Sequence, residues 1–498
     1  MRQNILLEQS LTWKEVAAVA EGASLALGHA AQGRVMAAQV LVQSIVQHGV
    51  RAYGVNTGVG ALCDTVVDAA KLAALSRNIV MSHAVGVGPA LEATAVRAII
   101  TAAVNNYAHG YSGVRPLVVE RLLALLTHDC VPEVPAGGSV GYLSHMAHVA
   151  LVLLGSGRAE VGGRVMSGAD ALASIGLQPL VLQAKEGLSL VNGTPCVTGL
   201  SAIALTRVAG LLDWADVIAA MTFENLHGQL AAFDPTALDL RLSAGVRLVG
   251  ERMREMLDGS AILRASIGTR TQDPLSLRAV PQVHGASRDV FRHAGEVVDA
   301  ELASVTDNPV VVGTPQEPRA LSGANAVGAA LALALDSLAV AVAEVAAMSE
   351  RRMDRLVNPL VSGLPAFLAA DSGAGSGFMI AQYTAVSLVA ENRRLAAPAS
   401  LDGGITSGLQ EDHLSHATPS ALKLLKIIEN AATILAIELL AAVQAYELQR
   451  NSLARAPRTE AIFSFVRSFI PQYRDDRPLG ADFELARDLL RRPPAGVR

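Results

Sequence analysis

Residues 324–348 read ANAVGAALALALDSLAVAVAEVAAM, a stretch of Ala, Leu and Val in which only Asp336 and Glu344 carry charge. Its length and apolar content suit either a membrane span or a helix buried in a protein core. A carboxylate in the middle of a bilayer costs about 2.5–3.5 kcal/mol. We therefore expect a long core helix and no membrane partner.

Apolar residues recur at helical spacing in four long segments, one of which contains this stretch, near residues 200–222, 324–352, 376–394 and 419–449. Strand signals are sparse, and the Gly-rich breaks between segments are typical of loops. These patterns predict an all-α fold. We expect a loop-rich N-terminal region that carries the active site over residues 1–195. A central bundle of long helices with C-terminal helices follows over residues 196–498, and the two form one continuous unit.

The composition narrows the possible partners and the compartment. Hydrophobic residues make up 51% of the chain and aromatic residues only 4%, which favours a core of small side chains between long helices. The net charge is −5 and no Lys/Arg cluster is interleaved with aromatics, so we expect no nucleic-acid partner. Three widely spaced cysteines argue against a disulfide framework, and the N-terminus lacks the apolar run of a signal peptide. We expect a cytoplasmic protein.

Motifs rich in Gly and polar residues follow one another along nearly the whole chain. They are YGVNTGVG at 53–60, SHAVGVG at 82–88, NGT at 192–194, QDPLSLR at 272–278, PQVHGA at 281–286, TDNP at 306–309, SERR at 349–352, SGFMIAQ at 376–382 and QEDH at 410–413. In kind and order this set resembles the aromatic amino acid ammonia-lyases, the family of histidine, tyrosine and phenylalanine ammonia-lyases. The resemblance implies an ammonia-lyase-like helical fold and a homotetramer whose active sites draw residues from several subunits.

One stretch departs from the family. Residues 137–148 read GGSVGYLSHMAH, whereas the family places Ala-Ser-Gly directly after Gly-Ser-Val-Gly and cyclises that triad into an electrophilic methylidene-imidazolone. Val140 follows Ser139, and its branched side chain hinders an equivalent ring closure. The sequence therefore predicts no methylidene-imidazolone and no other cofactor. Metal-ligand spacings such as HExxH do not occur, so no metal is expected either.

Tyr53, His83 and Glu411 are the first candidates for catalysis. Taken alone, Tyr53 is either a base whose pKa neighbouring positive charge lowers, or a phenol that anchors its loop. The resemblance assigns it proton transfer at the substrate β-carbon. Glu411 matches a position that is Glu in histidine ammonia-lyases, and His83 matches a residue that contacts the substrate ring, although most histidines are structural. The two form a second acid/base candidate.

Tyr142 and His145 are further catalytic candidates. They occupy positions where the family has Asp and Pro just after its triad. The missing residues are expected to bring this phenol and this imidazole into the space of the electrophile.

The resemblance also implies a substrate-binding set that includes Arg278. A guanidinium is a two-pronged donor for a carboxylate, although a lone Arg is more often part of a structural ion pair. Asn192, Gln272 and Asn308 carry over as amides around the same ligand. Leu275 replaces the family's Tyr and Ala326 its Phe, which removes a phenol and an aromatic wall.

These residues predict an enzyme that binds a small, amino-acid-derived carboxylate. Without the electrophile, our main hypothesis is a repurposed enzyme that uses acid/base chemistry for elimination, hydration, isomerisation or cyclisation. One alternative is an inactive pseudoenzyme that binds the ligand or a true ammonia-lyase. The other is an ordinary ammonia-lyase of the histidine type.

Overall fold

The computed structural model describes residues 4–401, 403–450 and 452–494, whose contacts form two compact units. Unit 1 combines Met1–Thr206, Ala294–Asp336 and Pro398–Leu422. Unit 2 combines Arg207–His293, Ser337–Ala397 and Lys423–Arg498. Each unit therefore joins three separate stretches of chain. This division by contacts does not test the two regions expected from the sequence, 1–195 and 196–498, which remain a prediction.

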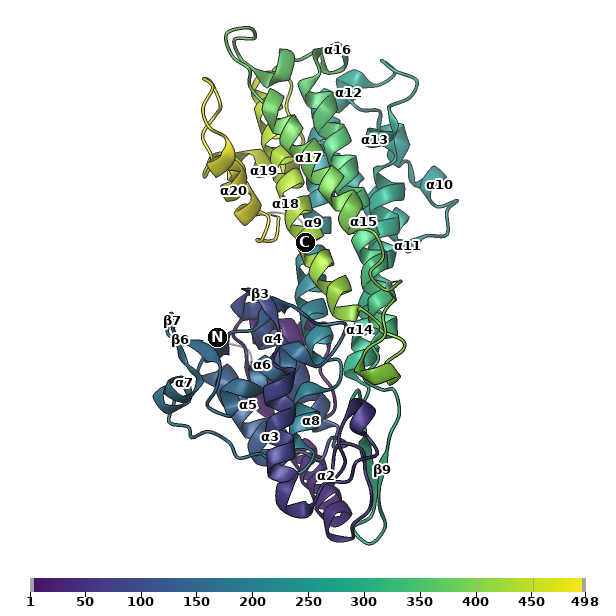
Figure 1. Cartoon of the computed structure of the whole chain (residues 1–498). Helices are drawn as coiled ribbons and strands as arrows, with labels where there is room; N and C mark the ends of the chain where they lie inside the picture. The colour runs from purple at the N-terminus through teal and green to yellow at the C-terminus, as the bar shows by residue number, and fades with distance from the viewer. Residues whose placement is uncertain (1–3, 402, 451, 495–498) are drawn as a thin grey trace. The chain divides into compact units, whose positions relative to one another are not determined.

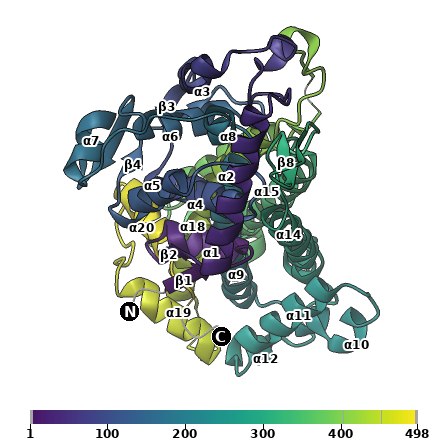
Figure 2. The same ribbon diagram turned by 90° about the horizontal axis from the view of Figure 1, so that it is seen from below.

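Unit 1 contains shorter helices and paired strands, and its helices α1, α2, α4 and α5 lie together (Figure 2). Its helices are α1 Trp13–Ala20, α2 His29–Gln47, α3 Leu72–His83, α4 Ala93–Ala108, α5 Pro116–Thr127, α6 Ser144–Leu153, α7 Gly168–Ser174 and α8 Glu186–Val191. Its strands are β1 Asn4–Leu7, β2 Ser24–Leu27, β3 Val87–Ala90, β4 Val131–Pro132, β5 Pro135–Gly137, β6 Arg158–Val161, β7 Arg164–Ser167, β8 Val310–Gly313 and β9 Pro318–Leu321.

The strands form small separate sheets. β1 pairs with β2 in parallel, whereas the pairs β3–β5 and β8–β9 and the three-stranded sheet β4–β6–β7 are antiparallel. The β3–β5 pair brings the end of the 82–88 motif beside the start of the segment that departs from the family. This pairing helps to position the candidate site.

Long helices supply most of the core. They are α9 Pro195–Asn225, α14 Val280–Leu302, α15 Ala329–Val357 and α18 Ala417–Glu447, and each has residues in both units (Figure 1). Unit 2 adds α10 Pro235–Leu238, α11 Ala244–Leu257, α12 Ala261–Ser266, α13 Leu275–Arg278, α16 Pro359–Ser362, α17 Met379–Leu395, α19 Pro457–Arg467 and α20 Gly480–Leu489.

Small residues let these helices approach closely. Within unit 1, a Cβ at Gly199 of α9 would lie 2.6 Å from the backbone nitrogen of Ile99 in α4, so only glycine fits there. Every residue from Ala95 to Ala108 of α4 is buried. The low aromatic content of the chain thus corresponds to helices whose backbones nearly touch.

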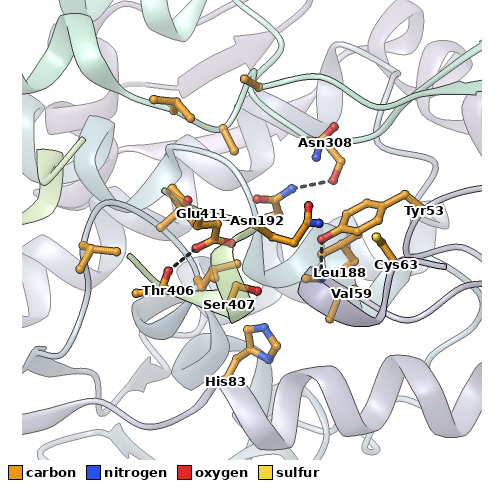
Figure 3. A pocket seen from close by; sticks show the side chains of 18 of the residues that line it. Tyr53, Val59, Cys63, His83, Leu188, Asn192, Asn308, Thr406, Ser407 and Glu411 are labelled. Carbon is orange, nitrogen blue, oxygen red and sulfur yellow. Dashed lines mark hydrogen bonds between the residues drawn. The ribbon is translucent and has the colours of Figure 1, made fainter. Parts of the chain in front are cut away.

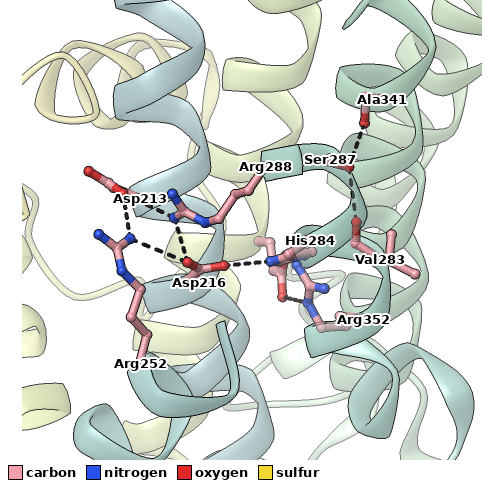
Figure 4. Close-up of polar contacts among 10 residues, drawn as sticks. Asp213, Asp216, Arg252, Val283, His284, Ser287, Arg288, Ala341 and Arg352 are labelled. Atoms are coloured by element: carbon pink, nitrogen blue, oxygen red, sulfur yellow. Dashed lines mark hydrogen bonds and ion pairs between the residues drawn. The ribbon is translucent and has the colours of Figure 1, made fainter. Parts of the chain in front are cut away.

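Buried charges link the helices of unit 2. Arg352 of α15 pairs with Glu438 of α18 at 2.6 Å, and both side chains are fully buried. His284 of α14 contacts Asp216 of α9, and Arg288 contacts the same carboxylate at 2.6 Å (Figure 4). These ionic contacts fix which faces of the helices meet.

The expectation of a helical protein is confirmed, with 59% of the chain helical. The four long segments expected from the sequence correspond to α9, α15, α17 and α18, although α15 begins only at Ala329. By length and composition alone, α15 and the segment Glu186–Asn225 would each be long enough to cross a membrane. Most of each apolar window is buried inside the protein, as it is in core helices.

Candidate active site

A cavity of about 940 Å³ lies in unit 1, and residues from five of the family-like motifs line it, those at 53–60, 82–88, 192–194, 306–309 and 410–413. Seven of the candidate residues line it: Tyr53, His83, Tyr142, Asn192, Asn308, Ala326 and Glu411. Figure 3 shows the side chains of Tyr53, Asn192 and Glu411 gathered in this cavity. The structure thus brings together residues from widely separated parts of the chain.

Tyr53 is held in its loop by a backbone donor. The amide of Gly60 donates to the phenol oxygen of Tyr53 at 3.1 Å. Burial raises the pKa of Tyr53 above its usual 10.0, the bond from Gly60 acts against this, and the charges of Glu411 and Cys63 raise it further. None of these causes is a positive charge that would lower the pKa of Tyr53. The phenol is therefore neutral when no ligand is bound.

His83 ends α3 with its ring fixed by the helix backbone. Its Nδ1 lies 2.7 Å from the carbonyl oxygen of Ile79. Burial lowers the pKa of His83 below 6.5, although the bond to Ile79 and the charge of Glu411 favour the protonated ring. A neutral ring whose Nδ1 donates to a carbonyl has a bare Nε2 that can accept a hydrogen bond.

The segment from Gly138 to Ser144 forms one wall of the cavity. The Ser139 hydroxyl donates to the carbonyl oxygen of Tyr142 at 3.0 Å and accepts from the amide of Gly141 at 3.2 Å. Gly141 has φ +145°, and a Cβ there would lie 2.7 Å from the Ser415 hydroxyl. This turn needs glycine and sets the direction in which Tyr142 leaves it.

Tyr142 and Glu411 meet in the cavity. Burial and the charge of Glu411 raise the pKa of Tyr142 to about 12. The carboxylate is supported by Thr406, whose hydroxyl donates to Oε2 of Glu411 at 3.0 Å. Glu411 therefore lies close enough to Tyr142 to raise the pKa of its phenol.

Asn192 and Asn308 form a linked pair. The side-chain amide of Asn192 donates to the backbone carbonyl of Asn308 at 2.6 Å, and the Asn308 side-chain oxygen accepts from the amide of Gly323 at 2.7 Å. Beneath them, Lys185 and Asp307 form a fully buried ion pair at 2.9 Å. These contacts fix the orientation of both asparagines.

His145 lies outside the cavity lining. Its Nε2 is 2.9 Å from the carbonyl oxygen of Ala136 in β5, and the residue is 1% exposed. Because α6 begins at Ser144, the ring turns toward the strand backbone and not toward Tyr142. Its contacts in the described structure are structural.

Arg278, Gln272 and Leu275 lie in unit 2, on or just before α13. With its amide in the orientation that satisfies both groups, Gln272 accepts from the two terminal nitrogens of Arg278 at 2.6 and 3.1 Å. Leu275 is exposed. The carboxylate-binding role of this group stays a prediction.

The cavity also contains residues that were not among the predicted site residues. Thr406 fixes Glu411, and Cys63 and Asp412 add a thiol and a second carboxylate to the lining. Asp412 lies inside the QEDH motif at 410–413, and this position could have marked it as a site residue. Across residues 4–401, 403–450 and 452–494, no group of three His, Cys, Asp or Glu side chains is placed to hold a metal ion.

The family's methylidene-imidazolone forms from Ala-Ser-Gly, which residues 137–148 do not contain. Ser139 precedes Val140, and its hydroxyl is held on both sides by Tyr142 and Gly141. Ser144 precedes His145, and its buried hydroxyl has no hydrogen-bond partner among the described residues. The residues of this segment do not fit the known precursor.

Comparison with known proteins covers nearly the whole chain. A family model described as aromatic amino acid lyase matches residues 11–468. Histidine ammonia-lyase of Symbiobacterium thermophilum is 44% identical over 96% of this chain and 95% of the relative. The enzyme of that name from Deinococcus radiodurans is 43% identical over 95% of this chain and 91% of its own length.

Solved structures of aromatic amino acid lyases and aminomutases also match the chain over nearly its whole length. Histidine ammonia-lyase from Trypanosoma cruzi matches with a TM-score of 0.90 and 36% identity, covering 98% of this chain and 93% of that one. Tyrosine aminomutase from Streptomyces globisporus matches with a TM-score of 0.94 and 33% identity over 100% of both chains. The expected ammonia-lyase-like fold is therefore confirmed.

Two expectations from the sequence are contradicted by these relatives. The main hypothesis of a repurposed acid/base enzyme is wrong, because relatives 40–44% identical over most of the chain bear the name histidine ammonia-lyase. They support the alternative of an ordinary histidine-type enzyme. The expectation of no cofactor is contradicted by the same relatives, since histidine ammonia-lyases normally use the methylidene-imidazolone. From its sequence and fold, this chain belongs to the aromatic amino acid lyase family.

Proposed function

We propose that this protein is an ammonia-lyase that acts on L-histidine. The observation that carries the proposal is the identity of 44% to a histidine ammonia-lyase over 96% of the chain. The cavity in unit 1 supports it, because Glu411 and His83 offer acceptors to the N–H groups of an imidazole. The reaction breaks the Cα–N bond, removes a proton from Cβ and forms the unsaturated acid with ammonia.

Tyr53 is the proposed proton-transfer residue at Cβ. Its phenol is neutral at pH 7, because burial raises its pKa. A cationic ligand beside the ring would favour the phenolate and lower that pKa, which is how substrate binding would prepare the base. The backbone bond from Gly60 acts in the same direction.

The substrate carboxylate is proposed to bind Arg278 of another subunit in the proposed tetramer, since Arg278 does not line the cavity of unit 1. Gln272 supports the guanidinium in one orientation, so the remaining N–H donors have a fixed direction. Asn192 and Asn308 would hold the amino-acid end within the cavity of unit 1, since their own contacts already fix both side chains.

A homotetramer is proposed as the assembled form, on the basis of the family resemblance. Apolar side chains exposed along one face of α17 support it, with Ile380 at 57%, Tyr383 at 65% and Val386 at 44% exposed. Contiguous apolar surface of this kind commonly marks a subunit interface. A cytoplasmic location stays part of the proposal, in line with three free thiols at Cys63, Cys130 and Cys196.

The proposal is tested by incubating the purified full chain with L-histidine, L-phenylalanine and L-tyrosine and measuring ammonia. Release from L-histidine, with the unsaturated imidazole acid in equal amount, is the expected result. Release from the other two amino acids alone would assign the chain to another branch of the family.

A further inference from the structure

His148 lies one helical turn beyond Ser144 in α6 and connects this helix to the segment that follows His83. Its Nε2 accepts from the backbone amide of Gly86 at 3.0 Å. Because a backbone amide can only donate, this nitrogen is unprotonated and the ring carries its proton on Nδ1. The contact therefore requires a neutral His148.

The link between α3 and β3, residues 84–86, is attached to α6 by this contact. Of its three backbone amides, the first two donate to carbonyls close by in the chain, at Val80 and His83. The third, that of Gly86, donates to His148. The imidazole thus ties the end of α3 to the helix that follows the departing segment.

The backbones at this point are tightly packed. A Cβ at Gly86 would lie 3.0 Å from Nε2 of His148 and 3.3 Å from the carbonyl oxygen of Gly137 in β5. A Cβ at Gly138 would lie 3.3 Å from the Cα of Gly86. The imidazole, the link and the end of β5 leave no gap between them, so a shift of the ring displaces both backbones.

Both backbones also form part of the cavity wall. His83 and Val85 of one stretch line the cavity, together with Gly138 and Val140 of the other. His148 does not line it. The imidazole can therefore affect a ligand only through these neighbours.

We infer that His148 is a positioning residue, whose unprotonated Nε2 holds the 82–88 segment, and with it His83, in the arrangement that binds the ligand ring. This inference rests on the proposed function, in which His83 accepts from an imidazole N–H, and deepens it by adding a control by pH. Protonation of His148 removes the acceptor and releases Gly86.

The surroundings of His148 set the pH at which this happens. α6 packs against α3, α7, α8, β4 and β5. Burial lowers the pKa of His148 below 6.5, whereas the charge of Glu133, between β4 and β5, raises it. Glu133 also pairs with Arg158 of β6 at 3.4 Å, and His145, three residues earlier in α6, interacts with His148 through charge. The contact is therefore complete above pH 6.5 and is lost as the pH falls through the folded pKa.

The test measures binding of imidazole-4-acrylic acid by isothermal titration calorimetry between about pH 5 and 8, the range in which histidine titrates. Wild type is compared with His148→Gln, whose amide oxygen is an acceptor that does not titrate, and with His148→Leu, which has no acceptor. His128→Gln is the matched control, since His128 is an exposed histidine of the same unit. The ligand and His83 titrate in every variant, so ratios of Kd isolate residue 148.

Above pH 7, His148→Gln should bind within about twofold of wild type, and His148→Leu about tenfold more weakly, as for a buried donor left without its acceptor. As the pH falls toward 5, wild type should lose affinity relative to His148→Gln by up to about tenfold, and His128→Gln should follow wild type. A constant ratio of wild type to His148→Gln at every pH would overturn the inference. So would a His148→Leu protein that is less stable but binds like wild type.

Hydrogen exchange of the Gly86 amide, compared at one pH, gives a second measurement that needs no ligand. Protection of this amide should be kept in His148→Gln and lost in His148→Leu, and equal protection in both would contradict the positioning role. If His148→Leu does not fold, wild type and His148→Gln suffice, because acid removes the acceptor from only one of them.

The outcome is separable from that of the proposed function. A wild-type protein that shows the expected pH dependence but releases no ammonia from L-histidine would contradict the proposed reaction and retain the inference. A protein that releases ammonia from L-histidine while wild type and His148→Gln share one pH profile of binding would do the reverse.

Discussion

His284 and Asp216 form a fully buried pair in unit 2, with Nδ1 of the imidazole 2.8 Å from Oδ1 of the carboxylate (Figure 4). Burial lowers the pKa of His284 below 6.5 in spite of the hydrogen bond to Asp216. The carboxylate also accepts from Arg288, and these contacts outweigh burial and lower the pKa of Asp216 below 3.8. The pair joins α14 to α9 and is sensitive to acid.

Acid should therefore destabilise the protein in two steps. Below about pH 6.5 the unfolded chain binds a proton at residue 284 that the folded ring resists. This contribution to stability is complete above pH 6.5 and decreases as the pH falls toward the folded pKa of His284. A second loss follows below about pH 3.9, where unfolded Asp216 binds its proton first.

The variant His284→Asn isolates the first step, because the Asn amide can replace the Nδ1 donor without titrating. Chemical denaturation between pH 5 and 7 should give a shallower decrease in unfolding free energy than in wild type, by at most about 1.4 kcal/mol per pH unit. Exposed His48→Asn is the control and should keep the wild-type slope. Equal slopes in all three proteins would refute the buried neutral imidazole.

The Arg352–Glu438 pair should dominate the electrostatic stability of unit 2. Both side chains are fully buried, and Thr222 donates to the same carboxylate at 2.7 Å. Replacing Arg352 with Met leaves a buried charge without its partner and should cost about 3–5 kcal/mol of unfolding free energy. Arg458→Met removes the half-exposed partner of Glu255 and should cost less than about 1 kcal/mol. Comparable losses in urea unfolding would count against this contrast.

Two glycine substitutions should have opposite effects. Gly141→Ala introduces a Cβ 2.7 Å from the Ser415 hydroxyl at φ +145°, so we expect a loss of about 1–3 kcal/mol and weaker binding in the cavity. Gly33→Ala lies in α2 with nothing within 4 Å of the new Cβ, and should stabilise by about 0.5–1 kcal/mol. Thermal unfolding of both variants measures the difference. A neutral Gly141→Ala would contradict the described turn.

Tyr53→Phe should lower turnover of L-histidine by about a hundred- to ten-thousand-fold, the usual contribution of general acid–base catalysis. The KM should change little, because the phenol is proposed to act on the Cβ proton and not to hold the ligand. Cys63→Ser, on the same cavity wall, is the control for local packing and should keep most of the activity. Full activity in Tyr53→Phe would remove this residue from the mechanism.

Much of the site could be predicted from the sequence, because ordered motifs specify their residues wherever the helices carry them. Tyr53, His83, Asn192 and Glu411 share one cavity although more than 350 positions separate the first from the last. Residues that act through geometry alone were missed. Nothing in the sequence marked Thr406 as the support of Glu411.

His145 shows the limit of proximity along the chain. Its place three residues after Tyr142 suggested a shared cavity, but Leu143 adopts φ +75° and α6 begins directly after it, which turns the ring to β5. The repurposed-enzyme hypothesis was wrong because it too was based on a short local segment. The missing Ala-Ser-Gly is one local difference, whereas the identity to a histidine ammonia-lyase extends over 96% of the chain.

The most direct test of the proposed function is ammonia release from L-histidine by the purified full chain, followed together with the near-ultraviolet absorbance of the unsaturated product. The account predicts ammonia and imidazole-4-acrylic acid in equal amounts, at a rate that Tyr53→Phe lowers by about a hundred- to ten-thousand-fold. No ammonia from L-histidine under conditions in which the protein is folded and binds imidazole-4-acrylic acid would contradict it.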